Sequence, residues 1–139
     1  MKITIINGPN LNLTGTREPG LYGNQGFAEF IPLLREKFSH ITIEYFQSNV
    51  EGEIINRIQE AAQSCTGIIL NAGGYSHTSV AIADAVAAIR TPVIEVHISN
   101  VFAREQYRQV SLTGAKTIGS ISGFGLYGYQ LALQYFSEH

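Results

Sequence analysis

The stretch Gly67-Ile68-Ile69-Leu70, followed at once by Asn71-Ala72-Gly73-Gly74, decides the fold class of this chain. A short apolar run that ends in polar and glycine residues is typical of a strand buried on both faces of a parallel sheet. Similar runs, rich in Ile and Val, occur at residues 3–6, 41–46, 92–96 and 117–121. Four of the five runs are apolar on both faces, so we expect one parallel sheet of buried strands.

Segments with helical periodicity separate these runs. Between residues 27 and 38 apolar side chains recur at spacings of three and four, and residues 51–64, 79–89 and 126–136 are also helix-like. Residues 100–111 are polar and predict only a short helix in place of a full crossover helix. Strands that alternate with helices predict an α/β fold. Right-handed crossovers leave few topologies, so we expect a flavodoxin-like three-layer sandwich with a five-stranded parallel sheet.

The composition favours one domain in a reducing compartment. The 139 residues fit a single domain, residues 1–139, and 45% of them are apolar. Charged residues make up only 14%, which indicates that other subunits cover part of the surface. The net charge of −2 provides no basic field for nucleic acid. A single cysteine, Cys65, with no membrane-length apolar run and no signal-peptide pattern, favours a cytoplasmic protein.

Polar or glycine-rich residues follow four of the predicted strands, at positions 7–10, 47–49, 71–77 and 97–100. In a doubly wound sheet the ligand lies beyond the carboxyl ends of the strands, so these segments should converge on one rim. The loop at residues 11–25 has little apolar periodicity, and its length indicates a lid or binding loop. It contains Arg17 and Tyr22, with nearby glycines as hinges.

Several familiar chemistries lack their sequence patterns. The glycines of residues 71–75 form neither GxGxxG nor a Walker loop, so nucleotide binding has weak support. His77 and His97 come without a cluster of carboxylates or cysteines, so we expect no metal site. No Gly-x-Ser-x-Gly elbow occurs, and Cys65 precedes a strand, at the wrong end for a nucleophile.

The remaining rim residues combine proton-transfer groups with hydrogen-bonding groups and arginines. They are Asn10, Arg17, Tyr22, Asn71, His77, Glu95, His97, Ser99, Arg104 and Arg108. Half of the arginines of the chain lie in this set, which favours a small anionic ligand rich in hydroxyl groups.

The rim motifs occur in a specific order along the whole chain. They comprise residues 6–13, 15–19 with Tyr22-Gly23, 46–49, 51–53, 71 with 74–81, 95–100, 103–105, and Gly125 with Gly128-Tyr129. In residues and spacing they resemble the type II 3-dehydroquinate dehydratases. Departures are few: Phe102 stands where the family often has histidine, Ala83 where it often has arginine, and residues 111–114 are looser than usual.

The resemblance implies a hydro-lyase that needs no cofactor. Its reaction is the anti elimination of water from 3-dehydroquinate through an enolate to give 3-dehydroshikimate, a step of the shikimate pathway. Tyr22 matches the base and Arg17 the cation that lowers its pKa. His97 matches the acid that protonates the leaving hydroxyl, and Glu95 orients that imidazole. Asn10 matches the residue that holds a water against the enolate oxygen.

The resemblance also assigns the groups that bind the substrate. Ile98 and Ser99 match the positions that take its carboxylate, whereas Asn71, His77 and Arg108 match those that grip its ring hydroxyls.

Asp84 matches a substrate-site position as well, although it lies about two helical turns beyond His77, away from the rim. Its helix is apolar nearly all round, so one face should pack on the sheet and the other on a neighbouring subunit. We therefore expect Asp84 to enter a neighbour's site, and the resemblance implies that the assembly is a trimer-based homododecamer. The alternative is a helix aspartate that pairs locally with a lysine or arginine.

Without the resemblance, several of these residues have plainer roles. Tyr22 would pack its loop, Asn10 would be a turn residue, Arg104 a solvated charge, and Glu95 with His97 a structural ion pair. Two other functions also stay open: a flavodoxin-like sensor or carrier of a small anion, and a flavin electron carrier. A carrier needs no proton-transfer groups, and the first turn lacks the Ser/Thr-rich phosphate loop of a flavin protein.

Overall fold

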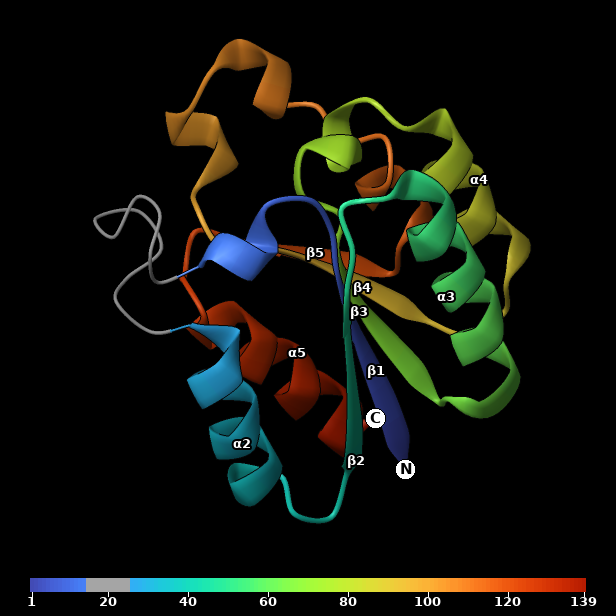
Figure 1. The fold of residues 1–139 in the computed structure, drawn as a ribbon, viewed down its shortest axis with the longest axis vertical. Helices are drawn as coiled ribbons and strands as arrows, with labels where there is room; N and C mark the ends of the chain where they lie inside the picture. Colours follow the sequence, from blue (N-terminus) through green and yellow to red (C-terminus); the bar gives the residue numbers. More distant parts are fainter. Residues whose placement is uncertain (15–25) are drawn as a thin grey trace.

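Five parallel strands form one sheet in the order β2-β1-β3-β4-β5 (Figure 1), in a computed structural model that describes residues 1–14 and 26–139. The strands are β1 (Lys2–Asn7), β2 (Thr42–Gln47), β3 (Gly67–Asn71), β4 (Val93–His97) and β5 (Gly119–Ser122). The α-helices are α2 (Phe27–Lys37), α3 (Glu51–Ser64), α4 (Val80–Ala88) and α5 (Tyr127–Glu138). This strand order is the flavodoxin-like one, and the predicted fold class is confirmed.

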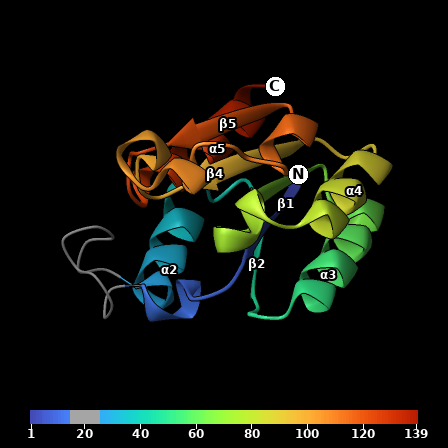
Figure 2. The same ribbon diagram turned by 90° about the horizontal axis from the view of Figure 1, so that it is seen from above.

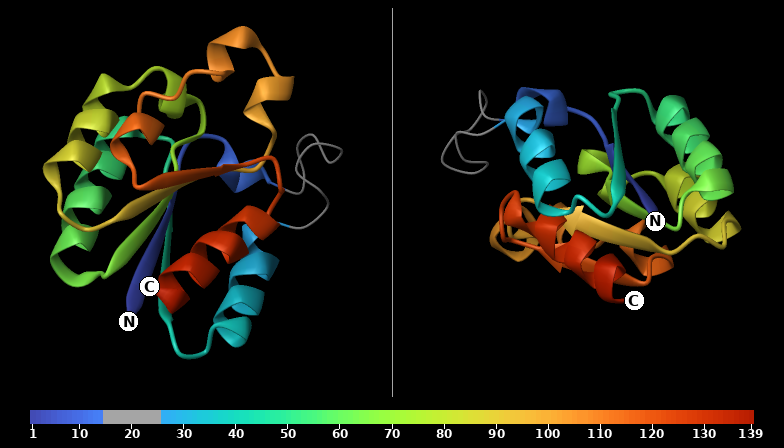
Figure 3. Two further views of the ribbon diagram at one scale, coloured as in Figure 1. Left: turned by 180° about the vertical axis from the view of Figure 1, so that it is seen from behind. Right: turned by 90° about the horizontal axis from the view of Figure 1, so that it is seen from below.

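The helices cover both faces of the sheet (Figures 2 and 3). Helices α2 and α5 pack on one face, where their side chains share a buried cluster with Ile5 of β1 and Ile69 of β3. Helices α3 and α4 pack on the other face, in a second cluster that includes Ile6 and Leu70. Because neighbouring residues of a strand point to opposite faces, apolar residues at consecutive positions serve both clusters at once.

Burial on both faces holds for the three central strands only. Strands β3 and β4 are buried throughout, and β1 is buried except at Lys2. Strands β2 and β5 are the sheet edges and remain partly exposed, because each has a neighbour on one side only. The expectation that four of the five runs are buried on both faces was therefore wrong for the edge positions.

The connection from β4 to β5 contains no α-helix, as the polar composition of residues 100–111 predicts. The single short helix expected there is two 3₁₀-helices, η3 (Val101–Ala103) and η4 (Gln106–Arg108), and a third, η5 (Gly114–Lys116), follows. Strand β5 starts at Gly119 and not at Thr117, because the Thr117 hydroxyl donates to the carbonyls of Gly114 and Gly119 and closes a turn.

The chain termini lie at the end of the sheet opposite the carboxyl ends of the strands (Figure 1). The loop after β1 begins with a 3₁₀-helix, η1 (Leu11–Leu13), and the loop after β3 contains another, η2 (Gly73–His77). In residues 1–14 and 26–139 no helix has the length and apolarity needed to cross a bilayer.

Candidate active site

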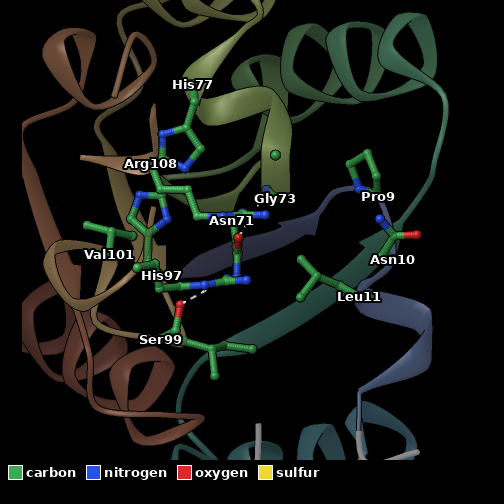
Figure 4. Close-up of a pocket in the computed structure, with 13 residues that line it drawn as sticks. Pro9, Asn10, Leu11, Asn71, Gly73, His77, His97, Ser99, Val101 and Arg108 are labelled. Atoms are coloured by element: carbon green, nitrogen blue, oxygen red, sulfur yellow. Dashed lines mark hydrogen bonds between the residues drawn. The ribbon is translucent and has the colours of Figure 1, made fainter. Parts of the chain in front are cut away.

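A pocket opens at the carboxyl ends of β1, β3 and β4 (Figure 4). Figure 4 shows His77, His97 and Val101 along one side of it, and Pro9, Asn10 and Leu11 along the other. It is lined by Pro9, Asn10, Leu11, Asn71, Gly73, Gly74, His77, His97, Ile98, Ser99, Val101, Arg104 and Arg108. The predicted meeting of polar segments at one rim holds for those after β1, β3 and β4, whereas residues 47–49 after β2 support Asn10 without lining the pocket.

The site residues named from the sequence fall into three groups. Eight line the pocket: Asn10, Asn71, His77, His97, Ile98, Ser99, Arg104 and Arg108. Glu95 lies behind the pocket in contact with His97, and Asp84 lies on the exposed face of α4, outside the pocket lining. Arg17 and Tyr22, with most of the lid expected at residues 11–25, lie outside the described residues.

The ends of β1 and β3 approach each other closely below the pocket. The amide of Gly8 donates to the carbonyl of Asn71 over 2.7 Å, and a side chain at Gly8 would collide with the backbone of Ala72. Gly73 has φ +61 and packs on the carbonyl of Pro9. Glycine is required at both points, so these residues bring the two loops together as one wall of the pocket.

Asn10 takes the left-handed conformation, with φ 70 and ψ −4, which asparagine tolerates better than most residues. Its backbone amide donates to Asn49 Oδ1 over 3.0 Å, and Gln47 Nε2 donates to the same oxygen over 3.2 Å. The polar loop after β2 therefore supports the loop after β1 and presents Asn10 at the pocket.

Asn71 is the end of a buried chain of hydrogen bonds. Its Nδ2 donates to the hydroxyl of Tyr129 over 2.9 Å, and that hydroxyl donates to Asn7 Oδ1 over 2.7 Å. Asn7 Nδ2 then donates to the hydroxyl of Tyr45 over 3.2 Å. Burial raises the pKa of Tyr45 and outweighs the lowering effect of this bond, so that phenol stays neutral. This series of hydrogen bonds fixes the orientation of the Asn71 side-chain amide.

His97 and Glu95 form a buried pair on β4. They lie two residues apart, hence on the same face of the strand, and His97 Nε2 is 2.9 Å from Glu95 Oε2. The carboxylate occupies Nε2, so Nδ1 is the nitrogen left for a pocket ligand. Burial by itself would raise the pKa of Glu95, but the hydrogen bonds from His97, Thr113 and Ser111 outweigh it and leave the pKa lowered. An ionised Glu95 accepts a hydrogen bond at His97 Nε2 and thereby fixes the orientation of the imidazole at the pocket.

The ring of His77 stacks on that of His97, with centroids 5.8 Å apart and planes 23° from parallel. Nδ1 of His77 lies 2.7 Å from the carbonyl oxygen of Val110, so this nitrogen carries the proton. The other ring nitrogen, Nε2, is then available to a ligand hydroxyl.

Among the residues that the structure describes, two arginines bring positive charge to the pocket. Arg104 Nη1 donates to Ser99 Oγ over 3.4 Å, the dashed line in Figure 4, and Arg108 Nε donates to Glu105 over 2.7 Å. Burial would lower the pKa of Arg108, but the pair with Glu105 outweighs it and raises that pKa. Both arginines line the pocket, and Arg104 lies beside Ser99, which suits an anionic ligand.

The two residues that depart from the family pattern, Phe102 and Ala83, lie outside the pocket lining. Phe102 is 69% exposed on η3, next to the pocket residue Val101, whereas Ala83 is buried on α4. Within the described ranges 1–14 and 26–139, His, Cys, Asp and Glu side chains form no group of three or more that would hold a metal ion.

Residues 1–137 match the family model described as dehydroquinase class II. The chain belongs to this family. A relative from Fusobacterium nucleatum, a 3-dehydroquinate dehydratase, is 51% identical over 144 residues and covers 100% of this chain and 98% of its own length. One of the same name from Campylobacter jejuni is 52% identical over 135 residues, 96% of this chain and 85% of its own.

A solved structure, the type II dehydroquinase from Butyrivibrio crossotus, superposes with a TM-score of 0.94 at 45% identity. The match covers 99% of this chain and 97% of that one. The chain therefore resembles this type II dehydroquinase in its three-dimensional structure as well as in its sequence.

Sequence reasoning missed several residues of this dehydroquinase site. Tyr129 was noted only as part of a motif, and Ser111 and Thr113 only within a loose segment, yet Tyr129 binds Asn71 and the two hydroxyls bind Glu95. The sequence signal that could have found Ser111 and Thr113 was the polar segment without periodicity that follows the rim arginines Arg104 and Arg108. Its partner, however, lies 16 residues earlier in the chain, on β4.

Proposed function

We propose that this chain catalyses the dehydration of 3-dehydroquinate to 3-dehydroshikimate, the hydro-lyase step of the shikimate pathway, in the pocket described above. The observation that carries the proposal is the buried pair of Glu95 and His97, which presents an imidazole to a pocket lined by two arginines. A protein that only binds or carries an anion has no use for such a proton-transfer pair.

The proposed reaction begins with removal of the proton next to the ketone. By family resemblance Tyr22 takes this proton, with Arg17 lowering its pKa, and the electrons of the C–H bond form an enolate. Asn10 holds a water against the enolate oxygen. Its left-handed backbone, supported by Asn49, places it on the wall of the pocket opposite His97, which supports this role.

The second half of the reaction expels the hydroxyl group. The enolate electrons form the new carbon–carbon double bond, the C–O bond breaks, and His97 donates its proton so that water departs. Glu95, held ionised, stabilises the charged imidazole before the transfer. The proton taken by the base returns to His97 through solvent, which balances the cycle without a cofactor.

Substrate binding is proposed for the remaining pocket residues. Ser99 and the backbone of Ile98 would take the carboxylate, because they lie beside the guanidinium group of Arg104. Asn71, His77 and Arg108 would bind the ring hydroxyls. Asn71 has a fixed amide and His77 an unshared ring nitrogen, and both line the same pocket.

We also propose that the chain assembles into a homododecamer built from trimers. The exposed face of α4 carries Val80, Ala81, Ala87 and Ala88 around Asp84, and Val80 is 62% exposed. An apolar helix face of this kind suits burial by a neighbouring subunit. Asp84 would then reach the neighbour's site, which its position outside this chain's own pocket supports.

Residues 1–139 are proposed to form one catalytic domain, because its pocket draws residues from the loop after β1 through η4. A cytoplasmic location is proposed from the single cysteine, Cys65, which is free and buried.

Ultraviolet detection of product tests the function directly. The product joins a carbon–carbon double bond to a carboxylate and a ketone, so it absorbs where 3-dehydroquinate does not. Purified protein should generate this absorbance, and borohydride should not inactivate it, because no imine is formed. Binding of 3-dehydroquinate without any rise in absorbance would instead identify an anion carrier and contradict the proposal.

A further inference from the structure

The turn from Ser111 to Gly114 lies behind the pocket and lines none of it. Three side-chain hydroxyls nevertheless converge there on Glu95. Ser111 Oγ lies 2.9 Å from both carboxylate oxygens, Thr113 donates to Oε1, and Ser120 Oγ lies 3.4 Å from Oε2. The same Oε2 faces His97, so both oxygens of the carboxylate have hydrogen-bond donors next to them.

We propose that Ser111 and Thr113 are positioning residues for the dehydration: their hydroxyls hold the Glu95 carboxylate ionised and directed at His97 Nε2. This inference rests on the proposed function, since it assigns the two hydroxyls a part in setting the acid of that reaction. Neither hydroxyl touches the substrate pocket, so each acts through Glu95 and His97.

The direction of the Ser111 hydroxyl is set by its neighbour. The backbone amide of Gly114 donates to Ser111 Oγ over 2.9 Å, so the oxygen serves as an acceptor on that side. Its hydrogen therefore points at Glu95, on the other side. Carboxylates that accept several such bonds are stabilised in the charged form.

Gly114 closes the remaining space around the carboxylate. A side chain at this position would collide with Glu95 Oε2, the oxygen that binds His97. The carboxylate thus fills the space that a larger residue would occupy, and substitution of Gly114 by alanine would push Oε2 away from the imidazole.

The same turn, together with Val110 just before it, also anchors the second histidine of the pocket. The amide of Leu112 donates to the carbonyl of Ser76 over 2.7 Å, and the carbonyl of Val110 binds His77 Nδ1 over 2.7 Å. One segment therefore orients both stacked imidazoles, one through a side chain and one through the backbone. Among the described residues, the other charged groups that line this pocket are Arg104 and Arg108.

The test combines a double variant, Ser111→Ala with Thr113→Val, with two independent measurements. In the dehydration assay we expect kcat to fall about tenfold or more, with KM changed less than about threefold, because the acid and not the binding groups is affected. In the protein without substrate, the ¹³C resonance of the Glu95 carboxyl, assigned with Glu95→Gln, should titrate at higher pH than in the wild type. This shift is expected because the hydroxyls removed in the variant stabilise the ionised carboxylate of Glu95 in the wild type.

Matched variants separate positioning from general damage. Thr113→Ser keeps the hydroxyl, so this single variant should retain the wild-type kcat and the wild-type titration of Glu95. Thr91→Val removes a hydroxyl that binds the remote carbonyl of Ala62, and it should change neither kcat nor that titration. Ser111 is only half-buried, so Ser111→Ala alone provides the test if the double variant does not fold. Gly114→Ala should lower kcat in the same way as the double variant.

The outcomes are distinguishable from failure of the proposed function. If the wild type does not dehydrate 3-dehydroquinate, that function is wrong, and the carboxyl titration still decides whether the turn holds Glu95. An unshifted titration in the double variant overturns the proposal, even if kcat falls. A shifted titration with wild-type kcat overturns it as well, because Glu95 would then be held without consequence for the reaction.

Discussion

Asn71, at the pocket end of β3, donates a hydrogen bond of 2.9 Å to the hydroxyl of Tyr129 on α5. The side chain of Tyr129 is fully buried between the sheet and the helix layer formed by α2 and α5. Asn71 Oδ1 accepts from the amide of Gly73 over 3.1 Å, so both ends of the amide group are engaged. The orientation of a pocket residue thus depends on a phenol from the far end of the chain.

Replacement of Tyr129 by phenylalanine should weaken both the fold and substrate binding. The change leaves Asn7 Oδ1 and Asn71 Nδ2 without their hydrogen-bond partner, which costs about 1–3 kcal/mol of unfolding free energy. KM should rise more than kcat falls, because Asn71 loses its fixed orientation. Urea unfolding and steady-state kinetics measure the two effects, with Tyr135→Phe, which removes a 42% exposed phenol, as the control. Wild-type KM and stability in Tyr129→Phe would contradict this role.

Substitution of the proposed base should remove turnover and spare binding. In Tyr22→Phe the ring remains but the proton acceptor is lost, so kcat should fall by about 10²-fold or more. Arg17→Ala should be nearly as damaging, because the tyrosine would return toward its ordinary pKa. Isothermal titration with 3-dehydroquinate checks binding beside the kinetic assay. Turnover near the wild-type rate in either variant would remove Tyr22 as the base.

Loss of His97 should slow the second half of the reaction more than the first. The base is assigned to the loop that contains Tyr22, whereas His97 comes from the end of β4, so the two proton transfers use different groups. In His97→Ala, exchange of the substrate α-proton with deuterated solvent should outlast dehydration, whose rate should fall by about 10²-fold or more. Mass spectrometry of recovered substrate measures the exchange. Equal loss of exchange and dehydration would mean that His97 is structural or only binds.

The lowered pKa of Glu95 predicts a stability loss in acid. A carboxyl whose folded pKa lies below its unfolded value stabilises the fold above the unfolded pKa, about 4.3, and this contribution disappears as pH falls through the folded pKa. The difference in unfolding free energy between wild type and Glu95→Gln should therefore shrink as the pH is lowered below that range. Denaturant titrations at a series of pH values measure it, and a difference independent of pH would be the contrary result.

Shared active sites should be revealed by complementation. If Asp84 serves a neighbouring subunit, co-refolding of inactive Asp84→Ala with inactive Tyr22→Phe should restore part of the activity, because some mixed sites draw both intact residues from different chains. Light scattering should show a large homo-oligomer. A monodisperse, active monomer would end the hypothesis that Asp84 acts across an interface.

The sequence by itself determined the layer architecture, the strand order and the location of the site. Apolar runs of four to six residues separated by amphipathic segments admit few arrangements, and the polar residues that follow the strands must then meet at one edge. The pairing of Glu95 with His97 was also predictable, because residues two apart on a strand share a face. The partial exposure of β2 and β5 follows from that order, because each outer strand has only one neighbour, although the composition of the runs by itself predicted burial on both faces for four of the five.

Only the tertiary structure decided which distant groups complete the site. Tyr129 reaches Asn71 across 58 positions, and Thr113 reaches Glu95 across 18, through loops whose path no periodicity specifies. Local patterns record which face of an element is apolar, and they determine the core for that reason. A hydrogen bond between a loop hydroxyl and a buried carboxylate leaves no such pattern, because it depends on how two non-repeating segments are folded against each other.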